Sequence, residues 1–123
     1  GINFNINNNE GINRDGGLLE YARINKITLQ AWSPFQYGMF EGTFIGSEKY
    51  PQLNALLNEY AKKYDTTPNA VAVAWIMRHP AEIQTIIGTT NINRIKEISK
   101  ATQFKISREE WYKLYLAAGK LLP

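Results

Sequence analysis

Residues Ile27–Pro34, with the sequence ITLQAWSP, carry the strongest signal for the fold of this chain. β-Branched and apolar side chains dominate Ile27–Trp32, which predicts a buried strand ending near Trp32 and Ser33. Pro34 lacks an amide proton and follows the strand closely. The next segment, Pro34–Glu48, contains three glycines and several aromatic residues. We interpret it as a long loop, and loops of this length in compact domains are usually functional or disordered.

A second buried strand is predicted at Gln84–Gly88, where β-branched residues again precede a glycine. Apolar spacing and capping signals predict helices around both strands. Thr67 is a predicted N-cap before Pro68, and Ser107 and Glu110 form a capping box. The predicted helices cover Gly17–Asn25, Tyr50–Tyr64, Pro68 to His79, Thr90 to about Ala101, and Trp111–Ala118.

Strands that alternate with helices predict an α/β fold with parallel pairing and helices packed outside the sheet. A closed barrel of eight such strands needs roughly 200 residues or more. The chain has 123 residues and two strong strand signals, so we do not expect it to close a barrel alone. We expect one partial domain over residues 1–123, in which the Asn- and Gly-rich residues 1–16 form a surface loop.

Composition excludes several classes of function. There is no cysteine, and no group of metal-ligating residues at ligand spacing predicts a metal site. The formal net charge is +3, but the cations are scattered, which favours a solvated surface and not a nucleic-acid partner. No apolar run approaches the roughly 18 residues of a membrane span, so neither a membrane partner nor a signal sequence is expected. These features fit a cytoplasmic enzyme.

Ligands of parallel α/β folds bind at the carboxyl ends of the strands. One such end carries the indole of Trp32, which offers a flat apolar face, followed by Ser33. The other carries small and hydroxylated residues at Gly88–Thr90, where free helix-start amides favour anions. Arg94 lies in the first turn of the helix that follows and can grip an anion with two hydrogen bonds. From the residues alone, core packing is the better explanation of Trp32.

At these residues the chain resembles the aldo-keto reductase family. The similarity rests on three blocks in the order and spacing typical of the family, and it extends from about Asp15 to Pro123. The blocks are Leu29–Pro34, Thr67–Pro68 leading to Ala74–Pro80, and Ile86–Thr90 with Asn91 and Arg94. The resemblance implies the C-terminal part of a (β/α)8 TIM barrel, with Ile27–Trp32 as its seventh strand and Gln84–Gly88 as its eighth.

The resemblance also implies an NADP(H) site. Trp32 would stack on the nicotinamide, and Gly88, Thr89 and Thr90 would lie along the adenosine phosphate. Arg94 would bind the 2′-phosphate, and Glu97 would contact the adenine. The loop beside the pyrophosphate would comprise Ser33, Phe35, Gln36 and Tyr37.

Two positions depart from the family pattern. Gly88 stands where many members have a lysine, and Ile98 replaces a frequent adenine-binding asparagine. Arg94 is thereby left as the sole contact that would favour NADP over NAD.

The resemblance implies no catalytic residue in this chain. The family's Asp, Tyr, Lys and His tetrad lies on earlier strands, and no residue here matches it. Trp75 and Trp111 are interpreted as structural, and His79 as a cation that complements a helix dipole. We therefore expect a fragment of an NADP-dependent oxidoreductase that is inactive alone and binds NADP weakly. The alternative is a non-catalytic module that self-associates to cover exposed barrel edges.

Overall fold

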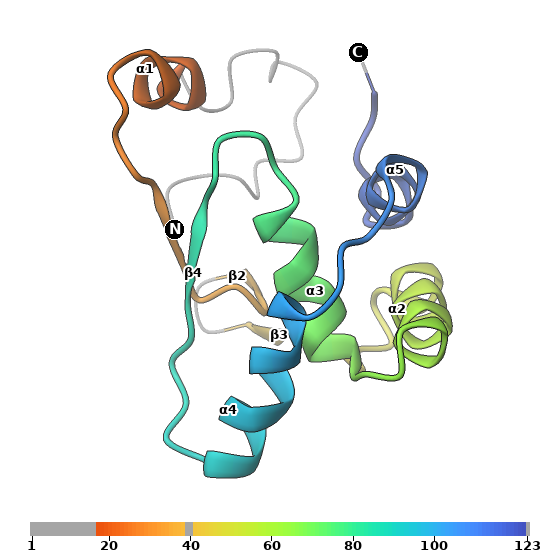
Figure 1. Ribbon diagram of the computed structural model, residues 1–123. Coiled ribbons are helices and arrows are strands. Elements are labelled where there is room, and N and C mark those ends of the chain that lie inside the picture. Colours follow the sequence, from red (N-terminus) through yellow and green to blue (C-terminus); the bar gives the residue numbers. More distant parts are fainter. Residues whose placement is uncertain (1–16, 39–40, 123) are drawn as a thin grey trace.

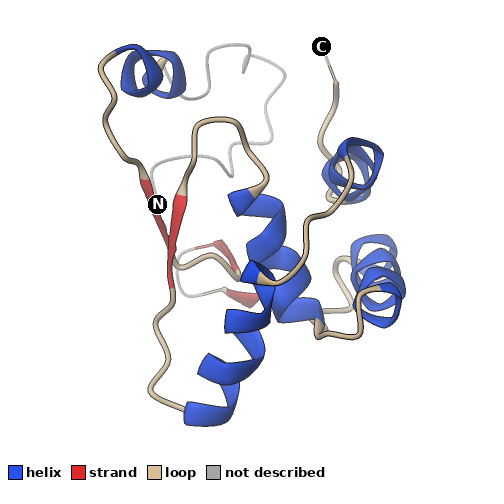
Figure 2. Ribbon diagram, viewed as in Figure 1, coloured by secondary structure: helices blue, strands red, loops and turns tan. Residues whose placement is uncertain are grey.

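The computed structural model describes residues 17–38 and 41–122. The predicted surface loop over residues 1–16 lies outside the described residues, as does Pro123. Five α-helices, one short 3₁₀ helix and four short strands make up the described part (Figures 1 and 2). In chain order these are α1 Leu18–Ile24, β1 Gln30–Trp32, β2 Gln36–Gly38, β3 Gly42–Thr43, α2 Pro51–Lys63, α3 Pro68–Met77, β4 Gln84–Ile86, α4 Ile92–Ser99, η2 Lys100–Thr102 and α5 Arg108–Ala117.

The predicted parallel pairing is confirmed. Strand β1 pairs with β4 in register, so that Ala31 lies opposite Thr85 and Trp32 opposite Ile86. The sheet has only these two strands in the described residues, and it is not closed. The structure thus confirms an α/β fragment with helices beside a parallel sheet, as expected from the chain's length.

The strands are shorter than predicted, and the prediction that they are buried is wrong. Successive side chains of a strand point to opposite faces. On one face Ala31 and Thr85 are half-buried. The other face, formed by Gln30, Trp32, Gln84 and Ile86, is exposed and is called the open face below. Apolar strands are buried on both faces only when further layers cover them, and the described residues supply a layer on one side alone.

Helix α3 forms the centre of the core. Its residues Ala70–Ala74 are all buried, because α3 packs against α2, α4, η2 and β4 at once. A helix that is apolar on all sides is typical of such a central position. The helix starts as predicted: the hydroxyl of Thr67 accepts a hydrogen bond from the Ala70 amide, and Pro68 occupies the first turn. Because α3 contacts β4 as well as the other core helices, the core supports the position of strand β4.

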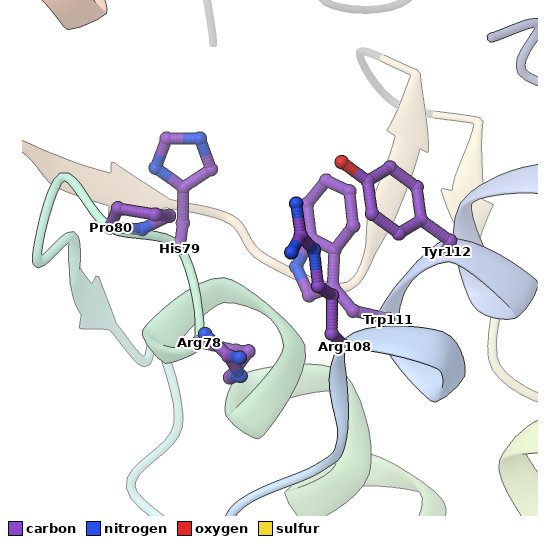
Figure 3. Close-up of a pocket in the computed structure, with 6 residues that line it drawn as sticks. All are labelled: Arg78, His79, Pro80, Arg108, Trp111 and Tyr112. Carbon is purple, nitrogen blue, oxygen red and sulfur yellow. The ribbon is translucent and has the colours of Figure 1, made fainter.

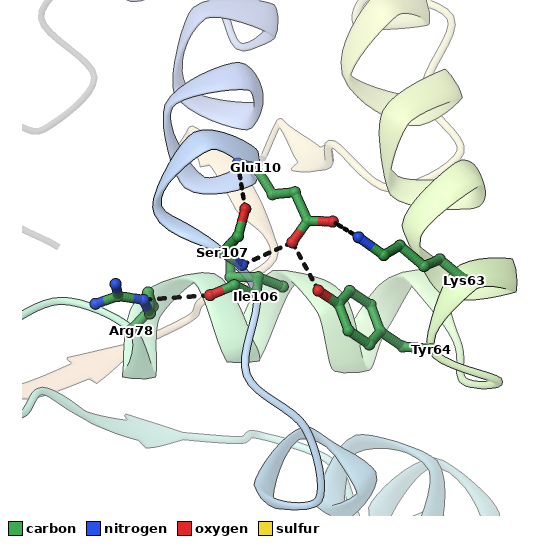
Figure 4. Close-up of polar contacts among 6 residues, drawn as sticks. All are labelled: Lys63, Tyr64, Arg78, Ile106, Ser107 and Glu110. Carbon is green, nitrogen blue, oxygen red and sulfur yellow. Dashed lines mark hydrogen bonds and ion pairs between the residues drawn. The ribbon is translucent and has the colours of Figure 1, made fainter.

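Helix α5 is attached to α2 by one buried carboxylate. The predicted capping box is present: Ser107 Oγ accepts from the Glu110 amide, and a Glu110 oxygen accepts from the Ser107 amide at 2.6 Å. Glu110 also accepts from Lys63 Nζ at 2.6 Å and from the Tyr64 hydroxyl at 2.7 Å (Figure 4). Burial by itself would raise the pKa of Glu110, but these donors outweigh it and lower the pKa to about 2.

The predicted long loop contains a small antiparallel hairpin. Strand β2 pairs with β3, although the pattern of Pro34–Glu48 predicted no regular structure. The hairpin is held to the core by Phe35, which packs against the buried cluster and whose carbonyl accepts from the Phe44 amide at 3.0 Å. Its closing residues 39–40 lie outside the described residues. The missed hairpin is short and contains glycines, which weaken any strand signal.

Candidate functional site

The carboxyl ends of β1 and β4 lie side by side. Trp32 and Ile86 are register partners at the last position of each strand, so the segments that follow, from Ser33 and from Ile87, leave the sheet at one edge (Figure 1). The indole of Trp32 is 58% exposed on the open face. Core packing therefore does not explain Trp32 in this chain, and its ring is available to stack on a flat ligand.

Ser33 turns the chain sharply at the end of β1. Its φ of +50° lies in the left-handed region, which is uncommon for a residue other than glycine. The turn is closed by a hydrogen bond from the Gln36 amide to the Ser33 carbonyl at 3.1 Å. Backbone in such a conformation is often found at functional sites, where surrounding contacts hold it. Gln36 itself is exposed.

Two of the predicted loop contacts, Phe35 and Tyr37, have their rings engaged by the protein. Phe35 packs against the core cluster. The Tyr37 ring lies edge-on to Tyr50, with centroids 5.4 Å apart, and Lys49 Nζ lies 4.9 Å from the Tyr37 centroid. A hydrogen bond to Tyr37 is the largest of the causes that raise the pKa of Lys49. The rings of Phe35 and Tyr37 thus hold the hairpin in place and are not free to contact a ligand with both faces.

The second strand end leads into α4 through a capped turn. Asn91 Oδ1 accepts from the amides of Asn93 and Arg94, at 3.0 and 3.2 Å, and Thr89 Oγ1 accepts from the Asn91 amide at 3.2 Å. The prediction of free amides at this helix start is therefore wrong for these three donors, because the side chains of Asn91 and Thr89 already satisfy them. Asn91 is a residue whose N-cap role the sequence pattern could have indicated.

The side chains at this end remain accessible. Thr90 and Arg94 are exposed, and Gly88 has open space where a side chain would begin. Within the described residues the Arg94 guanidinium makes no hydrogen bond or ion pair. Glu97 is half-buried one turn further along α4. The N-cap fixes the first turn of α4. It therefore also fixes the position on the helix from which the Arg94 side chain projects.

His79 is not the cation that the sequence suggested. Its Nδ1 accepts a hydrogen bond from the Ala81 amide at 3.1 Å, a role open only to an unprotonated ring nitrogen. Burial lowers the pKa of His79, and Arg23 lowers it further. The ring therefore closes the turn after α3 as a neutral acceptor. No described group of three His, Cys, Asp or Glu residues could hold a metal ion.

The sequence of this chain is similar to those of a known enzyme family. The model of the aldo/keto reductase family matches residues 4–115 of the chain. The chain belongs to the aldo/keto reductase family. Members of the family typically use NAD(P)H.

The relatives are about three times longer than this chain. A 6-dehydroglucose reductase of Agrobacterium fabrum (strain C58) is 36% identical over 106 residues, which cover 85% of this chain and 34% of that protein. A 9,11-endoperoxide prostaglandin H2 reductase of Trypanosoma cruzi is 33% identical over 93 residues, covering 76% and 29%. The chain thus spans about a third of the relatives it matches and is a fragment of the family fold.

A solved structure agrees with this assignment. The thermostable aldo-keto reductase Tm1743 superposes with a TM-score of 0.66 at 30% identity, over 85% of this chain and 35% of that enzyme. An aldose reductase of Giardia lamblia, at 19% identity and a TM-score of 0.65, shares the fold.

The nicotinamide dinucleotides that the family uses have a flat ring, a pyrophosphate and an adenosine end. The chain offers an exposed indole at Trp32, an unobstructed backbone at Gly88, and the guanidinium of Arg94, which has no partner among the described residues. These three groups correspond in chemical type to the three parts of the dinucleotide.

No helix in the described residues is long and apolar enough to cross a bilayer.

Proposed function

We propose that this chain is the C-terminal part of an NADP-dependent aldo/keto reductase barrel and carries part of its cofactor-binding surface. The intact enzyme would reduce a carbonyl with hydride supplied by the nicotinamide. The supporting observation is the parallel pairing of β1 with β4, since this brings Trp32 and the Gly88–Arg94 segment to one edge of the sheet. Separated ends could not contact the two halves of one dinucleotide.

Each end would contribute a different interaction. The exposed face of Trp32 would stack on the nicotinamide, and the backbone beyond Ser33 and Gln36 would approach the pyrophosphate. Gly88 and Thr90 would lie along the adenosine phosphate. Arg94 would bind the 2′-phosphate through its planar fork, with Glu97 near the adenine.

Replacing Arg94 with glutamine is expected to weaken NADPH binding by about 10- to 100-fold, because one charge-assisted contact is lost. Binding of NADH, which lacks the 2′-phosphate, is expected to stay nearly unchanged. Isothermal titration of both nucleotides measures the two affinities. Lys96→Gln removes the same charge from the same helix and is the control. Equal losses in both variants would show that Arg94 acts only through net charge.

The isolated chain is expected to show no carbonyl reduction. Reduction by hydride transfer needs a general acid for the carbonyl oxygen, and no residue here matches the family's catalytic tetrad. The assay is NADPH oxidation, followed by absorbance, with a small aldehyde and the pure 123-residue protein. Aldehyde-dependent oxidation well above a protein-free blank would contradict the expectation.

The open face supports a second candidate, in which the chain is a non-catalytic module that self-associates. Trp32 and Ile86 are 58% and 42% exposed on adjacent strands, and a second copy could cover them. A dimeric mass in light scattering together with no NADPH binding would favour this candidate over the first. A cytoplasmic location stays a prediction under either candidate.

A further inference from the structure

A hollow of about 380 Å³ lies at the other end of the sheet from the candidate cofactor site. It is lined by Arg78, His79, Pro80, Arg108, Trp111 and Tyr112. Residues 78–80 precede β4, whereas the segment that leads to Arg94 follows β4, so the two sites are separated by the length of the strand. The hollow is large enough for a small ligand.

Two arginines line this hollow, and none of its other described lining residues is acidic. Arg78 Nε donates to the Ile106 carbonyl at 3.2 Å, which anchors the side chain and leaves its two terminal nitrogens unbonded among the described residues. Arg108 makes no hydrogen bond or ion pair within the described part of the chain. No Asp or Glu lines the hollow there. Glu20 and Arg23 of α1 also act electrostatically on His79, and their opposite charges offset each other, so the two lining arginines leave a net positive charge that favours an anion.

The other lining groups add donors and an apolar wall. His79 Nδ1 is occupied as an acceptor from Ala81, so a neutral His79 ring carries its proton on Nε2 and can donate it. Trp111 is fixed by stacking on Trp75 and Tyr115, and Tyr112 lies edge-on to it. Figure 3 shows His79 and Pro80 on one side of the hollow and Arg108, Trp111 and Tyr112 on the other.

We propose that this hollow binds a small organic anion, a phosphate or carboxylate group attached to a ring. The anionic group would lie between Arg78 and Arg108, and the ring would lie against Pro80, Trp111 and Tyr112. Planar guanidinium forks match phosphate and carboxylate oxygens, and the aromatic side of the hollow suits a flat apolar body. The site shares no residue with the candidate cofactor surface.

The probe is phenyl phosphate, titrated calorimetrically against the full chain, with inorganic phosphate and phenol as its two halves. We expect saturable binding of phenyl phosphate in about the millimolar range, as suits a ligand of this size. Arg108→Gln is expected to weaken it by about tenfold. Arg108 is exposed at the start of α5, so the variant should fold, which far-ultraviolet circular dichroism checks.

Lys113→Gln is the matched control, since Lys113 is an exposed cation on the same helix that does not line the hollow. Unchanged affinity in this variant, with a tenfold loss in Arg108→Gln, supports the site. Three results would each overturn the proposal: no saturable binding of phenyl phosphate, equal weakening in both variants, or inorganic phosphate or phenol binding as tightly as phenyl phosphate. None of these results bears on NADPH binding by Arg94.

Discussion

Trp111→Ala is expected to lower the free energy of unfolding of this chain by about 3–5 kcal/mol. The Trp111 and Trp75 rings are stacked, with centroids 4.6 Å apart and planes 6° apart. Each indole also donates to the other residue's backbone carbonyl, at 2.9 and 3.0 Å. The Trp75 carbonyl lies in the last turn of α3, where helix carbonyls lack partners within the helix. The substitution thus removes ring packing and leaves a carbonyl without its donor.

Urea unfolding followed by circular dichroism measures this loss without depending on the fluorescence of the other tryptophans. Trp111→Phe is the matched control, because it keeps an aromatic ring but not the indole donor. We expect an intermediate loss of about 1–2 kcal/mol for that variant. A loss below about 1 kcal/mol for Trp111→Ala would mean that the α3–α5 contact is not needed for stability.

Glu110→Gln is expected to destabilise the chain by about 2–3 kcal/mol at pH 7. The pKa of Glu110 falls from its usual 4.5 to about 2, so the folded state favours the ionised carboxylate. The contribution is fully present above pH 4.5 and is lost as the pH falls toward 2. The full change in the pKa of Glu110 would correspond to a slightly larger loss. We give the lower range because the Lys63 side chain is 58% exposed, and solvent weakens its ion pair with Glu110.

The measurement is the free energy of unfolding of the wild type and Glu110→Gln at several pH values between 2 and 7. The difference is expected to shrink as the pH falls below 4.5. Glu109→Gln, at the exposed neighbouring position, is the control and should lie within about 0.5 kcal/mol of the wild type. A difference that stays constant with pH would show that the charge of Glu110 does not stabilise the fold.

Features set by neighbours along the chain were predicted correctly. Thr67 caps α3, Ser107 and Glu110 form the capping box, and alternating strands and helices indicated the parallel pair. Such signals depend on local hydrogen bonds and on spacing, which a single sequence contains.

Individual side-chain contacts between distant residues were not predictable. Lys63 and Glu110 are 47 residues apart in the chain, and Trp75 and Trp111 are 36 apart. The sequence did not indicate that the open face is exposed, because apolar strands are typical of a buried sheet. A sheet face is buried only when another layer packs on it, and the described residues include no layer on the open face. At the candidate site, the residue types and their proximity were predicted, but the capping roles of Thr89 and Asn91 were not.

We propose above that the ends of β1 and β4 together form one dinucleotide-binding surface. The most direct test is a titration of the isotope-labelled chain with NADPH, followed by two-dimensional amide NMR. We expect saturable shifts that cluster at residues 32–37 and 87–94, together with a shift of the Trp32 indole signal. No shifts at saturating nucleotide, or shifts at only one of the two strand ends, would contradict it.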